Sequence, residues 1–207
     1  MLDLRMPVLP SARGELLSQE VYRREFGARD AAIRNGSSWK LERRQHFEEV
    51  KSPSRDALRR GDWGEALRLF EARRAALREV EADEAARGAV FHRVRVVEEP
   101  LTPYLQWELH SLRIKAEYGE RVRILAAEAV AAAESGGLLP ELVIQDDAVL
   151  YRVLYTDAGA PNGAVRFTDR GIIDPWLACL KDAYVAAEDI ASYFDRAVAH
   201  LPPPPAA

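Results

Sequence analysis

The chain contains a single cysteine, Cys179, and only four lysines against 25 arginines among its 207 residues. One cysteine excludes an intramolecular disulfide and any zinc site built on cysteine pairs, and it is typical of proteins of the reducing cytoplasm. No window approaches 18 consecutive apolar residues, so we expect no membrane span. The first residues contain no continuous apolar segment of the signal-peptide kind, so we expect a cytoplasmic protein.

Histidine is also scarce, and its spacing excludes several classes of site. The four histidines, His46, His92, His110 and His200, include no pair at the i, i+4 spacing of a metal-binding helix. No glycine-rich phosphate-binding loop occurs, and Cys179 lies in an apolar stretch without a nearby base. The sequence therefore predicts no catalytic residue, no metal and no cofactor.

Charge is unevenly distributed along the chain. Residues 1–97 carry 20 Lys+Arg against 16 Asp+Glu, a net charge of +4, and the remaining residues carry 9 against 17, a net charge of -8. The first half could face an anionic partner, although a GC-rich genome would also produce this excess of arginine and alanine. The total charge of -4 and the lack of a recognition helix argue against binding to nucleic acid.

The hydrophobic pattern divides the chain into three parts. We expect an N-terminal arm with a short helix over residues 1–38, an α+β domain over 39–200 and a disordered tail over 201–207. The predicted fold is α+β, with a mixed sheet of about five strands that combines a βαβ unit with an antiparallel meander. Within the domain we expect a helical part at 54–88, a sheet part at 89–170 and a long terminal helix at 174–200. The helical part is expected to hold one short helix from Ser54 and then one long helix, with Asp62 as its N-cap and Gly88 as its stop.

The stretch "FHRVRVVEEPLTPYLQWEL", residues 91–109, carries the clearest pattern. Strand alternation places the valines on one face and Arg93 and Arg95 on the other, and a helix is expected to follow from Thr102 and Pro103. "GERVRIL", residues 119–125, repeats the alternation of arginine with apolar residues. Strand, helix and strand in this order predict two parallel strands joined by a right-handed crossover.

The later part of the chain predicts a meander and a helix. "ELVIQDDAVLYRVLYTDAGAPNGAVRFTD" is typical of three antiparallel strands, with the first turn at Asp146 and Asp147. The terminal helix is expected to begin after Asp174 as its N-cap. Its apolar residues keep a three-four spacing over about three heptads, which suits a helix that covers its own sheet or a second copy of the chain.

Arginines form the candidate site. If the two strands of the βαβ unit are neighbours, their four arginines share one face of the sheet, and Arg152 of the meander could join them. Such a cluster needs internal partners such as Glu98, Glu108 or Glu117, or an anionic ligand. The candidate ligand-binding residues are Arg93, Arg95, Arg121, Arg123, Arg152, Glu98, Glu99, Tyr104 and Trp107.

Several of these segments also resemble a known family. "RVRVVEEPLTPYLQWEL", "IQDDAVLYRVLYTDAGA" and the tryptophan of "DPWLACLKDAY" are similar to an uncharacterised family of actinobacterial proteins, often encoded beside helix-turn-helix regulators. The resemblance covers about residues 85–185 well and 39–60 loosely. The chain departs from the pattern at "ILAAEAV", where tryptophan, leucine, proline and arginine are usual, and at Gln145, which replaces an aromatic residue.

The resemblance implies a fold similar to half of a phospholipase-D-like domain. No histidine is followed two residues later by lysine, so the catalytic motif of those enzymes is absent. The preferred hypothesis is a non-enzymatic regulatory or protein-interaction module of an actinobacterial regulatory system, with a protein partner or a second copy as a dimer. The alternative is an enzyme or binding protein that acts on a phosphorylated or other anionic small molecule through the arginine-lined sheet face.

Overall fold

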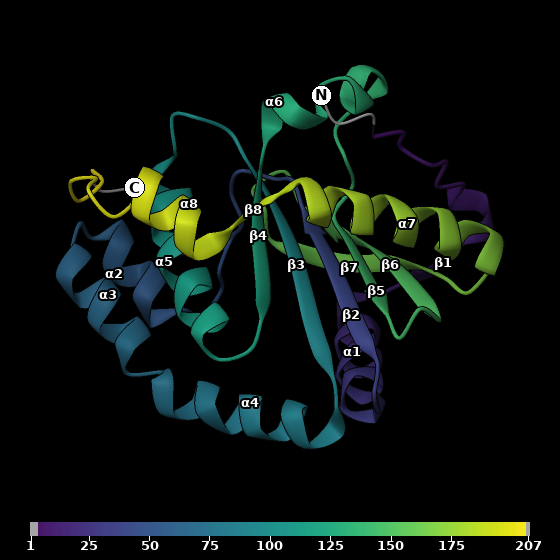
Figure 1. Ribbon diagram of the computed structural model, residues 1–207, viewed down its shortest axis with the longest axis horizontal. Helices are drawn as coiled ribbons and strands as arrows, with labels where there is room; N and C mark the ends of the chain where they lie inside the picture. The colour runs from purple at the N-terminus through teal and green to yellow at the C-terminus, as the bar shows by residue number, and fades with distance from the viewer. Residues whose placement is uncertain (1–3, 206–207) are drawn as a thin grey trace.

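The computed structural model describes residues 4–205, which form one mixed sheet with helices on both faces (Figure 1). The strands follow the order β1-β7-β6-β5-β2-β3-β4-β8. Neighbours β2, β3 and β4 are parallel, and the other neighbouring pairs are antiparallel. Their bounds are β1 (Glu15–Leu17), β2 (Ser37–Glu42), β3 (Val90–Val97), β4 (Arg121–Ala126), β5 (Leu142–Gln145), β6 (Val149–Tyr155), β7 (Pro161–Phe167) and β8 (Glu188–Asp189).

The α+β class and the mixed sheet are confirmed, but the sheet has eight strands and the expected number of about five is wrong. Two of the additional strands, β1 and β8, have three and two residues, which is too short for a periodic hydrophobic pattern. The segment expected as an arm therefore contributes a strand, and the boundary expected at residue 38 lies inside β2. Residues 1–3 of that arm lie outside the described residues.

The βαβ unit is confirmed. It consists of β3, helix α5 (Pro103–Glu117) and β4, and the two strands are parallel neighbours. The hydroxyl of Thr102 accepts a hydrogen bond of 3.1 Å from the backbone N–H of Leu105, as expected of the N-cap. The meander β5-β6-β7 is also confirmed, and Asp146 and Asp147 form its first turn with φ of 50° and 52°.

Three helices connect β2 to β3, where one short and one long helix were expected. They are α2 (Pro53–Arg59), α3 (Trp63–Glu71) and α4 (Arg74–Arg87). The long helix expected from Asp62 to Gly88 is interrupted at residues 72–73, because α3 buries Ala66 and Phe70 against α2 and α5, whereas α4 buries none of its residues and reaches this core only through the partly buried Leu77. The expected ends are confirmed: Asp62 caps α3, and Gly88 ends α4 in the left-handed conformation.

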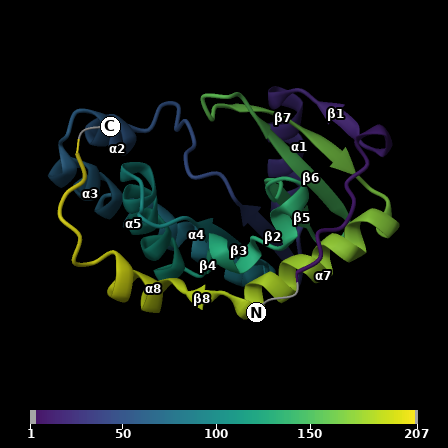
Figure 2. The same ribbon diagram turned by 90° about the horizontal axis from the view of Figure 1, so that it is seen from above.

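Different helices cover the two faces of the sheet (Figure 2). The α7 face, which holds Trp39, Leu41, Val94 and Val96, is apolar and is covered by helix α7 (Arg170–Ala186). The opposite α5 face is covered by α5 beside β4 and by helix α1 (Gln19–Ala32) beside β7. Charged side chains of the sheet lie between these two helices. Short helical turns occur at η1 (Ser11–Arg13), α6 (Ala127–Val130) and η2 (Ala133–Gly136).

The single terminal helix expected from Asp174 to residue 200 is wrong. Helix α7 begins earlier, with Asp169 as its N-cap, and includes Pro175. The chain then becomes extended at Ala187, pairs with β4 through β8, and continues as α8 (Ile190–Ala197). The apolar spacing is continuous in sequence, but α7 packs on the α7 face whereas Phe194 and Val198 of α8 pack with α5.

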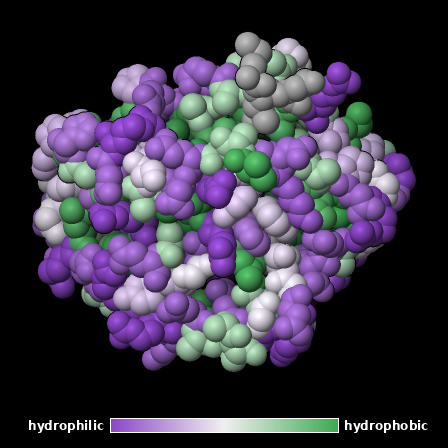
Figure 3. Space-filling view, in the orientation of Figure 1, coloured by the Kyte–Doolittle hydropathy of each residue, from purple (hydrophilic) through white to green (hydrophobic). Residues whose placement is uncertain are grey.

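The described residues contain no helix long and apolar enough to cross a membrane. In the view of Figure 3, polar side chains cover most of the surface and apolar ones are scattered in small patches. In the expected tail, residues 201–205 have no regular structure, and the Pro202 carbonyl accepts a hydrogen bond of 2.8 Å from Gln106 Nε2. Residues 206–207 lie outside the described residues.

Candidate ligand-binding cleft

The strand register separates the arginines that were expected to share a face. Arg93 and Arg95 of β3 lie opposite Val122 and Ile124 of β4, on the α5 face. Because neighbouring residues in register point to the same side, the arginines of β4 lie on the α7 face instead. Arg152 pairs with Leu142, which places it on the α7 face as well. The prediction of one face with four or five arginines is therefore wrong.

The arginines on the α7 face have separate environments. Arg121 is exposed at the start of β4. Arg123 is half-buried, and its Nη1 donates a hydrogen bond of 3.1 Å to the Tyr184 carbonyl while the guanidinium lies 4.6 Å from the Tyr184 ring centre. His92 lies on this face, as its alternation with the valines indicates, and stacks on Trp39 at 4.0 Å between ring centres.

On the α5 face, Arg93 lies in a buried network of ion pairs. Its Nη1 is 2.5 Å from a carboxylate oxygen of Glu42, and its Nε donates to Glu120. Lys40 also pairs with Glu42, at 2.5 Å. Burial alone would raise the pKa of Glu42, but Arg93, Lys40 and Arg95 hold that pKa well below its usual value. We name Lys40, Glu42, Arg93 and Glu120 the ion-pair cluster.

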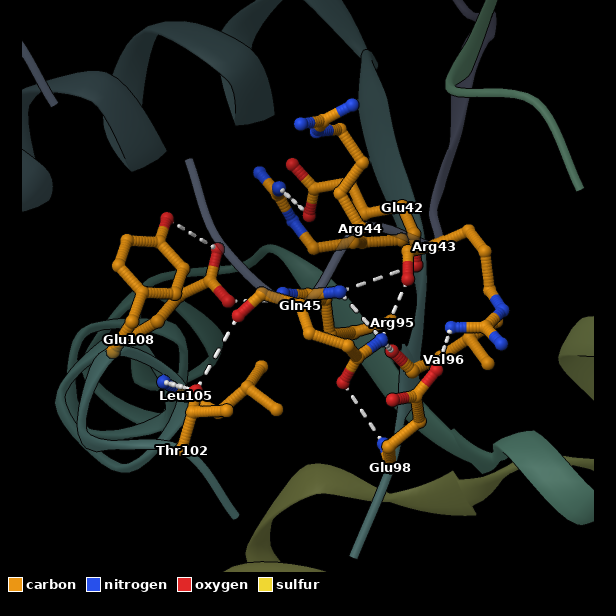
Figure 4. Close-up of polar contacts among 12 residues, drawn as sticks. Glu42, Arg43, Arg44, Gln45, Arg95, Val96, Glu98, Thr102, Leu105 and Glu108 are labelled. Carbon is orange, nitrogen blue, oxygen red and sulfur yellow. Dashed lines mark hydrogen bonds and ion pairs between the residues drawn. The ribbon is translucent and has the colours of Figure 1, made fainter. Parts of the chain in front are cut away.

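Arg95 is fully buried beside this cluster (Figure 4). Its Nε donates a 2.8 Å hydrogen bond to Glu108 of α5, and its Nη1 donates to the Val96 carbonyl at 3.0 Å. The Tyr104 hydroxyl lies 3.2 Å from the other oxygen of Glu108. Burial raises the pKa of Glu108 despite the charge of Arg95. The expected pairing of a β3 arginine with Glu108 is thus confirmed.

The other predicted acids lie outside the cluster. Glu98 pairs with Arg43 at 2.6 Å and donates its backbone N–H to Gln45, at the carboxyl ends of β2 and β3 (Figure 4). Glu99 accepts a hydrogen bond of 3.1 Å from the Tyr193 hydroxyl. Glu117 pairs with Arg74. These contacts hold connecting loops and helix ends in place, which accounts for the three carboxylates structurally.

The carboxyl of Glu141 also holds the end of β2. Its Oε1 accepts hydrogen bonds from the backbone N–H groups of Arg43 and Arg44, at 2.9 and 2.7 Å. Its Oε2 is buried and has no hydrogen-bond partner among the described residues. Burial, together with the charge of Glu42, raises the pKa of Glu141 to about 7.

Two adjoining cavities open on the α5 face and share Lys40, Arg93 and Lys115. The larger has a volume of about 400 Å³ and the smaller about 270 Å³. The larger lies within the range of roughly 300–1,000 Å³ that is usual for small-molecule sites. We call the two cavities together the cleft. Its larger chamber has an apolar wall made of Tyr22, Phe26, Leu77, Val80, Phe91 and Tyr118.

Lys115 differs from the other cations of the cleft. Lys40 and Arg93 are paired within the ion-pair cluster, whereas the Lys115 ammonium forms no ion pair with a carboxylate of residues 4–205. Burial lowers the pKa of Lys115, and the neighbouring charges of Arg93 and Lys40 lower it further against the opposing effect of Glu120. Among the three cations that the two chambers share, Lys115 is therefore the one without an ion pair to a carboxylate of residues 4–205.

Helix α4, which runs below β3 and β4 in Figure 1, lines the larger chamber and forms its cover. None of its residues is buried, although Leu77, Val80 and Glu84 line the larger chamber. It is attached near its ends: Arg74 pairs with Glu117 of α5, and Arg87 Nη1 donates a 2.9 Å hydrogen bond to the carbonyl of Asp30 in α1. The cover of the cleft is thus a helix whose middle contributes little to the core.

Sequence reasoning missed most residues of the cleft. The signal that could have found Lys40 and Glu42 is their alternation in "WKLERR", which places both on one strand face. Lys115 and Glu120 lie where helix α5 ends and β4 begins, and no local pattern marks them. Of the predicted aromatic residues, Tyr104 contacts Glu108, and Trp107 lines the smaller chamber while donating to the hydroxyl of Ser54 at 2.9 Å.

Arg55 is a further buried arginine that the sequence did not single out. It is 4% exposed, and its guanidinium lies 5.5 Å from the ring centre of Tyr104 and 6.0 Å from that of Trp107. Its Nε and Nη1 have no hydrogen-bond partner among the described residues. The described residues hold no group of three or more His, Cys, Asp or Glu side chains suited to a metal ion.

Comparison with known protein families assigns most of the chain to a family. A family model described as a domain of unknown function, DUF6879, matches residues 25–195, which include every lining residue of the cleft except Tyr22. No curated protein matches the chain. The match begins within α1 and ends within α8, so it covers α5 completely and the second part of α1.

Proposed function

The chain belongs to the DUF6879 family, and we propose that it is a non-enzymatic regulatory module that binds a small molecule in its cleft and reports the binding through helix α4. One observation carries this proposal: a chamber of about 400 Å³ lies under a helix of 14 residues, none of which is buried. A helix held mainly at its ends can change position or order at low energetic cost when a ligand fills the space beneath it.

The response would be read at the outer surface of α4. A ligand in the larger chamber would contact Leu77 and Val80 and would add to the limited packing that α4 has through Leu77. Ordering of α4 would then present a fixed surface of arginine and glutamate side chains to a protein partner. The resemblance to actinobacterial proteins encoded beside helix-turn-helix regulators supports a partner of the regulatory class, and we place both proteins in the cytoplasm.

In this proposal the ion-pair cluster has a structural role at the base of the cleft. Its cations are neutralised by Glu42 and Glu120, which favours a binding role over a catalytic one.

A specific observation favours a second candidate function, an enzyme that acts on an anionic small molecule. Glu108 lines the smaller chamber, and burial raises its pKa. Chemical change of the bound compound would identify the enzyme.

The test combines ligand screening with blocking of the chamber. A library of metabolites is screened against the full chain by thermal shift, and amide hydrogen exchange is followed for every hit. We expect hits that raise the melting temperature and slow exchange within residues 74–87. Leu77→Trp should abolish these effects by filling the chamber, whereas Val185→Trp, at a residue that is 76% exposed on α7, should leave them intact.

Three outcomes would overturn the proposal. A complete absence of hits would remove the small-molecule site. Hits that bind Leu77→Trp as well as the native protein would place the ligand elsewhere. Hits that leave exchange in α4 unchanged would remove the reporting role of the helix. Conversion of a hit, followed by mass spectrometry, would replace the regulatory module with the enzyme.

A further inference from the structure

We propose that the ligand of the cleft is an amphipathic anion, with a carboxylate or phosphate group bound by Lys115 and an apolar body in the larger chamber. This inference rests on the proposed function, because it names the chemical class that the same cleft accepts. It goes beyond that function in assigning a charge, an anchoring residue and an orientation to the ligand.

The first argument is the balance of charge in the larger chamber. Three cations line it, Lys40, Arg93 and Lys115, against two carboxylates, Glu84 and Glu120. Glu120 is already bonded to Arg93, and Arg93 is bonded to Glu42 as well. Burial, together with the charges of Asp30 and Glu120, raises the pKa of Glu84, so that this carboxyl takes up a proton more readily than an exposed one. With Lys40 and Arg93 neutralised in the ion-pair cluster, Lys115 is the lining cation left to meet a ligand, and Glu84 is the one lining carboxylate outside that cluster.

The second argument is the position of the unpaired cation. Lys115 lines both chambers, and the charges that act on it are those of Glu120 and Glu42, both already bonded to Arg93, and of Arg93 and Lys40. A half-buried ammonium without a bonded carboxylate is unfavourable, and a carboxylate or phosphate oxygen at hydrogen-bond distance would relieve it. A neutral or cationic ligand would leave that unfavourable state in place.

The third argument is the chemistry of the wall. Besides Val143 of β5, six aromatic or aliphatic side chains line the larger chamber, from α1, α4, β3 and the end of α5: Tyr22, Phe26, Leu77, Val80, Phe91 and Tyr118. Inorganic phosphate alone would leave these apolar side chains exposed to water, whereas an apolar chain or ring would bury them. The anionic group therefore points to Lys115 and the apolar body points to α1 and α4.

The test uses three probes that share one apolar chain and differ in the head group. Sodium octanoate, 1-octanol and octylamine are titrated into the full chain by isothermal calorimetry. We expect octanoate to bind about ten- to a hundredfold more tightly than 1-octanol, which corresponds to one hydrogen bond to a charged group. We expect octylamine to bind no better than 1-octanol.

Matched lysine variants assign the preference to a residue. Lys115→Met keeps the apolar stem and removes the ammonium, so it should reduce octanoate affinity to that of 1-octanol. Lys181→Met removes a lysine that lies over Trp39 on the α7 face, and it should leave the preference unchanged. Lys115→Arg should restore most of the preference for octanoate.

Equal binding of octanoate and 1-octanol to the native protein would overturn the inference, and so would a preference for octylamine or a preference that survives Lys115→Met. The comparison of probes on the native protein decides the matter even if Lys115→Met fails to fold. If octanoate shows no preference while other compounds still raise the melting temperature and are blocked by Leu77→Trp, the anion inference fails alone. If no compound is blocked by Leu77→Trp, the proposed function fails with it.

Discussion

Removal of Arg95 is the sharpest test of the energetics under the cleft. The sequence places Arg95 on a strand face opposite to the valines, where an exposed arginine would tolerate substitution. The structure buries it completely, 2.8 Å from the carboxylate of Glu108. Arg95→Met preserves most of the side-chain volume but leaves Glu108 buried without its cation. We therefore expect Arg95→Met to cost about 3–5 kcal/mol of unfolding free energy.

The double variant Arg95→Met/Glu108→Leu separates this penalty from the loss of packing. It removes both charges together, so we expect the unfolding free energy to return to within about 1–2 kcal/mol of the native value. The measurement is urea denaturation of the native protein, both single variants and the double variant, with unchanged slopes as evidence that the denatured state is the same. The expected coupling between the two residues is at least about 2 kcal/mol.

The pH dependence supplies an independent check. The folded-state pKa of Glu108 lies above its ordinary value because of burial, so its contribution to stability is full below the unfolded pKa and is lost as pH rises through the folded pKa. Without Arg95, the folded pKa rises further. The loss of unfolding free energy caused by Arg95→Met should therefore be smaller at about pH 5 than at about pH 8. A deficit under about 1 kcal/mol at both values, or a double variant as unstable as Arg95→Met, would refute the role of the buried pair.

Three further predictions concern other parts of the fold. Glu141 has a folded pKa of about 7, above its unfolded value, so it favours folding at low pH and loses that contribution as pH rises through about 7. The unfolding free energy of the native protein should therefore fall by the order of 3 kcal/mol between about pH 5 and pH 8, and urea titrations of Glu141→Gln should not show this fall. Gly163→Ala should lower the unfolding free energy by about 1–3 kcal/mol, because φ is +89° and the new Cβ would lie 2.2 Å from the Leu17 carbonyl oxygen. The control Gly64→Ala, whose new Cβ would have nothing within 4 Å, should cause no measurable loss in the same assay. Val94→Asp should leave the chain unfolded by circular dichroism, because Val94 is 1% exposed in the core of the α7 face.

The sequence predicts the core better than the site because the two depend on different information. Alternation along β3 is a local property, and it correctly assigns Val94 and Val96 to the core. The grouping of arginines depends on the register between β3 and β4, and a shift of one residue moves every side chain of a strand to the other face. Arg93 and Arg123 occur in similar motifs, yet the register places them on opposite sides of the sheet.

The terminal helix shows a second limit of local patterns. An apolar spacing of three and four residues continues through Ala187, but it cannot show that Leu180 and Phe194 pack into different clusters. The cleft shows a third limit. Lys115 is defined as part of a site by Arg93 and Lys40, which are distant in sequence and become neighbours only when β2, β3 and α5 assemble. Such sites become recognisable only after the fold is known.

The break between α7 and α8 has a consequence for how copies of this protein can meet. Extended strands at the border of a sheet attract further strands, and long ones lead to aggregation or exchange between molecules. Here the chain after α7 folds back along β4, and the two residues of β8 pair with β4 and occupy hydrogen-bonding positions that would otherwise be open on that strand. The opposite border, β1, is only three residues long. Sheet-to-sheet association therefore has little backbone to use at either border, and a dimer of this chain would meet through helices or loops, where the side chains and not the main chain determine the partner.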